Sequence, residues 1–296
     1  MSLPDVFVHR PIEDEDLEAV VALVNACELH DTGRVMMERA DLVADMGTDG
    51  FNRERDAVLV ADGGRIVGWG LLLHGRTAWA DVHPDARGRG IGTWLRRWSE
   101  RRAREMGLTK IGQVFEDHRT DVADMLRAAG YMPGHRSWIL RKDHTERPEE
   151  PIFPPDVEVR PYSPDVEEAV LTMFEGAFSE FHDRSPSTLA TWRAMVTRRE
   201  GFVPDDLVLA VEDDIIVGAA FLIDADEIWV DKLAVHRDHR RRGIARGLLQ
   251  MAFRRSFDRG YVRTSLSTDS RTGALGAYER VGMRVVESFT TYSLEL

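Results

Sequence analysis

Two turns that combine arginine and glycine carry the clearest chemical signal in the sequence. One has the spacing R-x-x-G-x-A over residues 240–245, and the other has the spacing R-x-x-G-x-G over residues 87–92. In both copies an apolar stretch predicts a strand that ends at the turn, and a helical pattern follows it. Backbone N–H groups at a helix N-terminus bind phosphate, and small residues let the backbone approach it closely. Each turn is therefore predicted to hold a phosphorylated ligand.

Competing phosphate and metal motifs are missing from the sequence. It contains no G-x-x-x-x-G-K-[ST] pattern, and the glycines at 88–92 lack the third glycine of a dinucleotide fingerprint. His236 and His239 are close in sequence but have no further ligands at metal spacing. We therefore expect neither a P-loop nor a metal site.

The turns lie within an internal repeat. Arg10 and Arg160, each followed by proline, match at an offset of 150 residues, whereas Arg87 and Arg240 match at 153. Each copy predicts a short strand, an acidic helix start, a second helix, a β-hairpin, a strand entering the turn, a long helix, a strand, a short helix and a last strand. The last strands are expected within 137–140 and 284–296. The elements that position the turns are thus present twice.

A segment rich in charge and proline separates the two copies. Residues 143–155 contain four prolines and no core pattern. Proline stiffens a chain and prevents regular structure, so this segment is predicted to be a linker. The expected domains are then 1–142 and 156–296.

The composition restricts the function classes. The net charge of −12 argues against general nucleic-acid binding and is compatible with a cationic substrate such as an amine. No apolar run approaches the ~18 residues of a membrane helix, so no membrane association is expected. There is no signal-peptide core, and the single cysteine, Cys27, lies in an apolar run. We expect a cytoplasmic protein, a monomer or homodimer, in which Cys27 is buried filler.

Each half resembles a GNAT-type, acetyl-CoA-dependent N-acyltransferase domain. The resemblance is carried by the turn with its flanking strand and helix, and by residues 274–283, which are similar to the family's A…Y-x-x-x-G-F signature. The duplication resembles two-domain members of the mycothiol-synthase type. The resemblance implies an α+β fold with two tandem domains, each a mixed, mostly antiparallel sheet flanked by helices.

The resemblance also implies roles for particular residues. Tyr278 matches the tyrosine that protonates the departing thiolate, and a carboxylate on the strand before the turn often acts as base. Asp231 and Glu227 are the candidates, because they are expected to share one strand face with 229, 233 and 235; His182 is a third candidate. Many members have asparagine seven residues before the tyrosine, where this chain has Arg271. The implied acetyl-CoA contacts are Leu233, Ala234, Val235, Arg240, Arg241, Arg242, Gly243, Ile244 and Ala245, with Val82, Arg87, Gly88, Arg89, Gly90, Ile91 and Gly92 in the first copy.

The first copy lacks the matching proton-transfer groups. Leu126 stands in the place of Tyr278, while Ala78 and His74 take the places of Asp231 and Glu227 at an offset of 153. Asp81 is present but on the opposite strand parity. The N-terminal half is therefore expected to bind acetyl-CoA weakly or structurally and to be catalytically silent.

The predicted reaction is direct attack by a primary amine of a small molecule on acetyl-CoA, in the C-terminal half. One alternative is an enzyme that acts on protein N-termini or lysines. Another is a coenzyme A sensor without catalysis. The identity of the acceptor stays open at this point.

Overall fold

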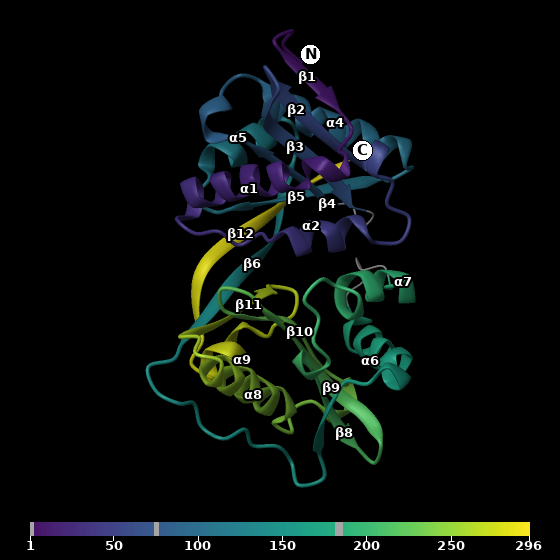
Figure 1. The fold of residues 1–296 in the computed structure, drawn as a ribbon, viewed down its shortest axis with the longest axis vertical. Helices are drawn as coiled ribbons and strands as arrows, with labels where there is room; N and C mark the ends of the chain where they lie inside the picture. Colours follow the sequence, from purple (N-terminus) through teal and green to yellow (C-terminus); the bar gives the residue numbers. More distant parts are fainter. Residues whose placement is uncertain (1–2, 74–76, 181–185) are drawn as a thin grey trace. The chain divides into compact units, whose positions relative to one another are not determined.

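The computed structural model describes residues 3–73, 77–180 and 186–296, and these form two compact units (Figure 1). Unit 1 comprises residues 1–134 and 291–296, and unit 2 comprises residues 135–290. The chain passes from one unit to the other twice. This division differs from the expected boundary, because the proline-rich segment 143–155 lies within unit 2, where the amide of Ile152 donates to Gln250 at 3.1 Å.

Unit 1 contains a mixed sheet in the order β1-β2-β3-β4-β5-β12. The pairs from β1 to β4 are antiparallel, and β4 is parallel to β5. The strands and helices of this part of the chain are β1 (Phe7–Arg10), α1 (Leu17–Thr32), α2 (Arg39–Met46), α3 (Arg53–Asp56), β2 (Ala57–Asp62), β3 (Arg65–Leu73), β4 (Thr77–Val82), α4 (Ile91–Glu105), β5 (Lys110–Glu116), α5 (Thr120–Ala128) and β6 (Met132–Asp143).

Helices α1 and α4 cover opposite faces of the unit 1 sheet (Figure 1). Side chains alternate along a strand, so neighbouring residues of β2 mark the two faces. Leu59 packs with Val20 of α1, whereas Val60 packs with Ile91 and Leu95 of α4. A group on the α1 face and a ligand at the start of α4 are therefore separated by the sheet.

Unit 2 repeats this architecture with the order β6-β11-β10-β9-β8-β7. Leu209 of β8 packs on the α6 face with Val170, and Ala210 packs on the α8 face with Leu248. Its elements are β7 (Glu158–Pro161), α6 (Glu167–Phe178), α7 (Leu189–Trp192), a π-helical turn (Arg193–Thr197), β8 (Leu207–Glu212), β9 (Ile215–Asp224), β10 (Ile228–Val235), α8 (Ile244–Asp258), β11 (Arg263–Asp269), α9 (Leu275–Arg280) and β12 (Arg284–Glu295).

The last strands of the two copies are exchanged. Strand β6, which ends the first copy, pairs with β11, with Leu140 opposite Leu266. The end of β12 belongs to unit 1, where Leu296 donates to the carbonyl oxygen of Thr109 at 2.9 Å and Tyr292 lies in a core cluster with Leu126. The expectation that each last strand closes its own copy is wrong. A local pattern identifies a strand, but pairing partners distant in the chain decide which sheet it joins.

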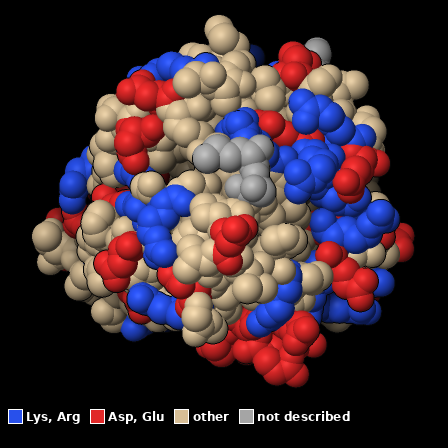
Figure 2. All heavy atoms as spheres, turned by 90° about the horizontal axis from the view of Figure 1, so that it is seen from above, with Lys and Arg blue, Asp and Glu red and all other residues tan. Residues whose placement is uncertain are grey.

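Surface charge is intermixed. On the face of the molecule shown in Figure 2, Lys and Arg side chains lie beside Asp and Glu side chains. Within the described ranges, no helix combines the length and apolar character needed to cross a membrane. The described residues also contain no group of three His, Cys, Asp or Glu side chains that could hold a metal ion.

Candidate active site

The two arginine- and glycine-containing turns, at 87–92 and 240–245, have the same backbone conformation. Gly88 and Gly90 have φ angles of 75° and 89°, and Arg241 and Gly243 have φ angles of 63° and 95°. The N–H groups at the start of α4 and α8 have no partners within the helix, so they face outward as donors. A Cβ added at Gly243 would meet no atom within 4 Å, so the space in front of the turn is open to a ligand. The residues present therefore fit the diphosphate of coenzyme A.

The first arginine of each turn braces the turn from within the protein. Nε of Arg87 donates to the carbonyl oxygen of Val82 at 3.1 Å, and Nε of Arg240 donates to that of Val235 at 3.2 Å. Nη2 of Arg240 also donates to the carbonyl oxygen of Ala177 in α6, at 2.9 Å. Both side chains hold the end of a strand and the end of a helix together. They position the cradle, whose donors are backbone groups.

The other arginines of the turns divide into two kinds. Arg89 pairs with Asp62 at 2.8 Å, and Arg242 pairs with Glu212 at 2.7 Å, so both are tied to the neighbouring hairpin. Arg241 is exposed and adopts the left-handed conformation that a β-carbon disfavours. The first copy has glycine at this place. The backbone conformation of this position favours glycine, so the geometry of the turn does not account for the arginine in the second copy.

Replacing Arg241 by glycine separates the charge from the geometry of the turn. We expect the free energy of unfolding to rise by about 1 kcal/mol, because glycine tolerates the positive φ angle. We expect the dissociation constant for acetyl-CoA to rise by roughly threefold to tenfold at low salt, and by less at high salt, because an exposed charge near the phosphates is lost. Calorimetric titration at two ionic strengths measures this, with Arg246→Ala as control. An unchanged affinity at low salt would show that Arg241 contacts no phosphate.

The strand before each turn separates from its parallel neighbour. Among the described residues, β4 pairs with β5 at Thr77 and Gly112 and no further along β4, and the register of β10 with β11 ends at Val230. Residues 232–235 of β10 remain paired with β9 on their other side. The separated edge offers backbone N–H and C=O groups to an extended ligand, as in strand addition. This geometry supports the expected contacts of Leu233, Ala234 and Val235 with the pantetheine chain.

Strand β10 contains a bulge at Asp231. Val230 lies opposite Leu222 and Lys232 lies opposite Phe221, so Asp231 is an extra residue in the pairing. The expectation that the odd-numbered residues from 227 to 235 share one face is therefore wrong, since Val230 and Val235 both pack on the α8 face. A bulge bends a strand and redirects a side chain, and bulges are frequent beside active sites. The side chain of Asp231 is 28% exposed, and its carboxylate pairs with Nζ of Lys232 at 2.5 Å.

The first copy has no counterpart of this bulge. Strand β4 pairs with β3 without interruption, and Ala78 lies opposite Leu72 just as Val230 lies opposite Leu222. The constant offset that matched Ala78 with Asp231 fails because the bulge inserts a residue. His74, the match for Glu227, and the candidate base His182 lie outside the described residues.

Glu227 precedes β10 and is held by two arginines. Its carboxylate lies 2.9 Å from Nε of Arg263 and 3.6 Å from Nε of Arg141. The side chain is only 14% exposed, which makes these ion pairs part of the local structure.

Tyr278 lies in α9 and is half-buried against the α8-side core. Burial raises the pKa of its phenol, with a smaller opposing effect of a hydrogen bond with Thr268. The phenol therefore stays protonated, as a proton donor must. Leu126, its counterpart in unit 1, is fully buried in an apolar cluster. Arg271, which stands where many family members have asparagine, pairs through its guanidinium with Asp269 at 2.6 Å.

Unit 1 has an acidic side chain that was not among the proton-transfer candidates expected from the sequence. Asp81 of β4 accepts a hydrogen bond from Nε1 of Trp69 at 2.9 Å, which places it on the α1 face. Burial, more than the nearby Glu116, raises the pKa of Asp81 to about 6. The signal available in the sequence was a carboxylate in an apolar strand directly before the turn. Cys27 is 2% exposed, and burial raises its thiol pKa to about 12, so it is not a nucleophile.

The comparisons with known proteins agree with this geometry. The model of the acetyltransferase (GNAT) family matches residues 20–131 and again residues 167–283. A GCN5-related N-acetyltransferase from Sphaerobacter thermophilus is 30% identical and superposes with a TM-score of 0.80, covering 99% of this chain and 97% of that one. A tandem GNAT protein from the clavulanic acid biosynthesis pathway shares the fold at 16% identity, with a TM-score of 0.75 and 98% of each chain covered. A comparison with curated proteins finds no match.

Two copies of one acetyltransferase fold, each with an arginine- and glycine-containing turn before its long helix, define the class of this protein. The chain belongs to the acetyltransferase (GNAT) family, with two tandem domains. It is an N-acyltransferase that uses acetyl-CoA.

Proposed function

We propose that the protein transfers an acetyl group from acetyl-CoA to the primary amine of a small molecule, and that unit 2 is the catalytic unit. One observation carries the proposal. Unit 2 combines the turn at 240–245, a separated strand edge, a bulged Asp231 and a protonated Tyr278. Unit 1 has the turn and the separated edge, but an unbulged strand and Leu126.

The proposed roles follow from what acyl transfer to an amine requires. The coenzyme supplies an activated acetyl thioester. Asp231 takes the proton of the incoming ammonium group, directly or through water, because only a neutral amine can attack. Backbone N–H groups of β10 stabilise the developing oxyanion, and Tyr278 protonates the departing thiolate. Glu227 is proposed to support the site through its arginine pairs.

Matched substitutions of the two carboxylates test this assignment. For Asp231→Asn we expect kcat/KM to fall by roughly a hundredfold, the usual contribution of a general base, while the affinity for acetyl-CoA is kept. The loss should shrink as the pH rises, because more amine is then neutral without help. For Glu227→Gln we expect lower stability and a smaller loss of rate. Free thiol release against a panel of amines measures both.

The same panel separates the proposal from its rivals. It should contain small polyamines, amino sugars, amino acids and a peptide with a free N-terminus. Thiol release with the peptide and with none of the small amines would favour a protein N-acetyltransferase. Binding of acetyl-CoA without release from any acceptor would favour a coenzyme A sensor, and an Asp231→Asn rate equal to wild type would exclude Asp231 as base.

A further inference from the structure

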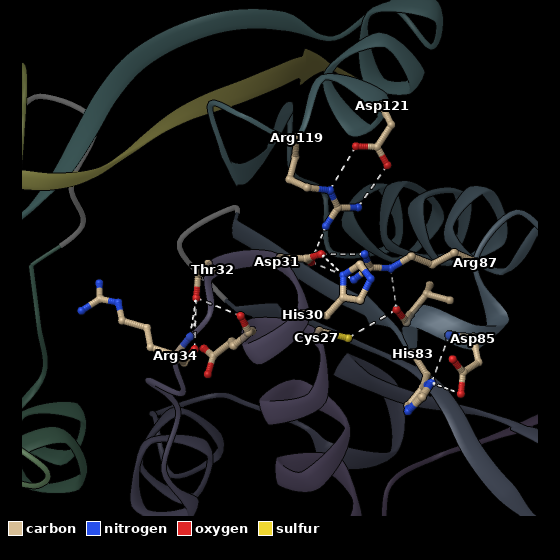
Figure 3. Close-up of polar contacts among 12 residues, drawn as sticks. Cys27, His30, Asp31, Thr32, Arg34, His83, Asp85, Arg87, Arg119 and Asp121 are labelled. Atoms are coloured by element: carbon tan, nitrogen blue, oxygen red, sulfur yellow. Dashed lines mark hydrogen bonds and ion pairs between the residues drawn. The ribbon is translucent and has the colours of Figure 1, made fainter.

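Unit 1 contains an ion-pair bridge centred on Asp31, at the C-terminal end of α1 (Figure 3). Arg87 of the phosphate-binding turn binds both carboxylate oxygens of Asp31, each at 2.7 Å. Arg119, from the loop between β5 and α5, donates to Asp31 at 2.5 Å and to the two oxygens of Asp121 at 3.0 and 3.1 Å. We call Arg87, Asp31 and Arg119 the Asp31 bridge.

The bridge is shielded from water and strongly bonded. The side chain of Asp31 is 9% exposed and that of Arg119 is 16% exposed. Burial alone would raise the pKa of Asp31, but hydrogen bonds from Arg87 and His30 and the charge of Arg119 hold that pKa below its ordinary value. Ion pairs of this kind are worth more than exposed ones, since solvent screens them less. The bridge is therefore a defined structural feature of unit 1.

The Asp31 bridge lies between the ends of the two strands that flank the predicted ligand site of unit 1. Arg87 is anchored at the end of β4 through Val82, and Arg119 follows the end of β5. These are the two strands that separate after Thr77 and Gly112. The bridge joins their ends on the α1 face, opposite the face covered by α4. An acyl chain that runs from the turn at α4 between these strand ends to the α1 face would meet the Asp31 bridge.

Unit 2 arranges the matching arginines differently. Arg240, the counterpart of Arg87, donates to Glu180 at 2.9 Å. Arg271, the counterpart of Arg119, is held at its own strand end by Asp269, which accepts from Nη2 at 2.6 Å and from the backbone amide at 2.8 Å. In unit 1 the arginine after β5 reaches across to α1, whereas in the described part of unit 2 the guanidinium of Arg271 bonds to Asp269 at the end of β11.

We propose that the Asp31 bridge closes the acyl passage of unit 1, so that this unit keeps a complete phosphate-binding turn but takes up acetyl-CoA only when the bridge is opened. The inference rests on the proposed use of the turns for acetyl-CoA. This closure explains how unit 1 can retain the turn and still not catalyse acetyl transfer. If the passage is open in fewer than about one molecule in ten, the apparent dissociation constant of unit 1 rises more than about tenfold.

The test isolates unit 1 by blocking the turn of unit 2 with Gly243→Trp, in the full-length chain. In this background, Arg119→Ala should lower the dissociation constant for acetyl-CoA by about tenfold or more, measured by calorimetric titration. Removing a positive charge ordinarily weakens binding of a polyanion, so a gain cannot be a general charge effect. Asp31→Asn, which keeps the shape of the side chain, should give a gain in the same direction, while the exposed Arg104→Ala should give none.

Two further measurements locate the gained site and separate the possible failures. In Arg119→Ala with an intact Gly243, the binding stoichiometry should rise from about one to about two, and adding Gly90→Trp should return it to one. If wild type already binds two equivalents, or if neither bridge variant gains a site while wild type binds one, the Asp31 bridge is not a closure. If wild type binds no acetyl-CoA at all, the proposed function itself fails.

Discussion

Replacing Tyr278 by phenylalanine is expected to lower kcat by roughly a hundredfold or more, the usual contribution of a general acid, while acetyl-CoA binds as in wild type. Phenylalanine keeps the ring that packs against the α8-side core and removes only the hydroxyl. Because burial raises the pKa of Tyr278, the wild-type phenol remains a donor at least up to its ordinary pKa near ~10. The thiolate would leave unprotonated in the variant.

Thiol release under saturating substrates and titration of acetyl-CoA measure the two effects separately. Tyr292→Phe, which removes a hydroxyl from the core of unit 1, is the matched control and should keep the rate. A Tyr278→Phe rate within threefold of wild type, with coenzyme binding retained, would mean that water or another residue supplies the proton. We expect no activity from Leu126→Tyr, since unit 1 also lacks the bulged carboxylate.

Replacing Glu100 by alanine is expected to destabilise unit 1 by about 3–5 kcal/mol, because it leaves a buried arginine without its partner. Glu100 is 8% exposed and Arg96 is 9% exposed, and the two form an ion pair one turn apart on α4. Tyr131 donates to Glu100 at 3.3 Å, and its hydroxyl would lose this acceptor too.

The repeat offers an apolar replacement for this pair. Leu249 and Phe253 occupy the matching positions of α8, and both lie in the α8-side core. The double variant Arg96→Leu, Glu100→Phe should recover most of the stability lost in Glu100→Ala, since an apolar pair replaces a buried ion pair at little cost. Chemical denaturation with hydrogen exchange along α4 measures the change, and exposed Arg101→Ala is the control. A double variant no more stable than Glu100→Ala would show that the polar pair is needed for packing.

The local chemistry of this protein is determined by its sequence. The repeat, the two turns and the order of strands and helices follow from residue types at short spacing, because hydrophobic period, glycine and acidic helix starts act over one element at a time. The apolar surroundings of Cys27 likewise predicted its burial, which the structure confirms. The family resemblance then supplied the roles proposed for Tyr278 and Asp231.

The tertiary structure decided which residues meet. The bulge at Asp231 changes the face of every residue after it, and nothing in the local pattern separates a bulged strand from a regular one. The exchange of β6 and β12 depends on pairing between segments far apart in the chain. The Asp31 bridge joins residues 56 and 88 positions apart, a contact that only the folded chain creates. Short-range spacing therefore predicted the two turns, whereas the side chains that each turn contacts are decided by residues far apart in the chain.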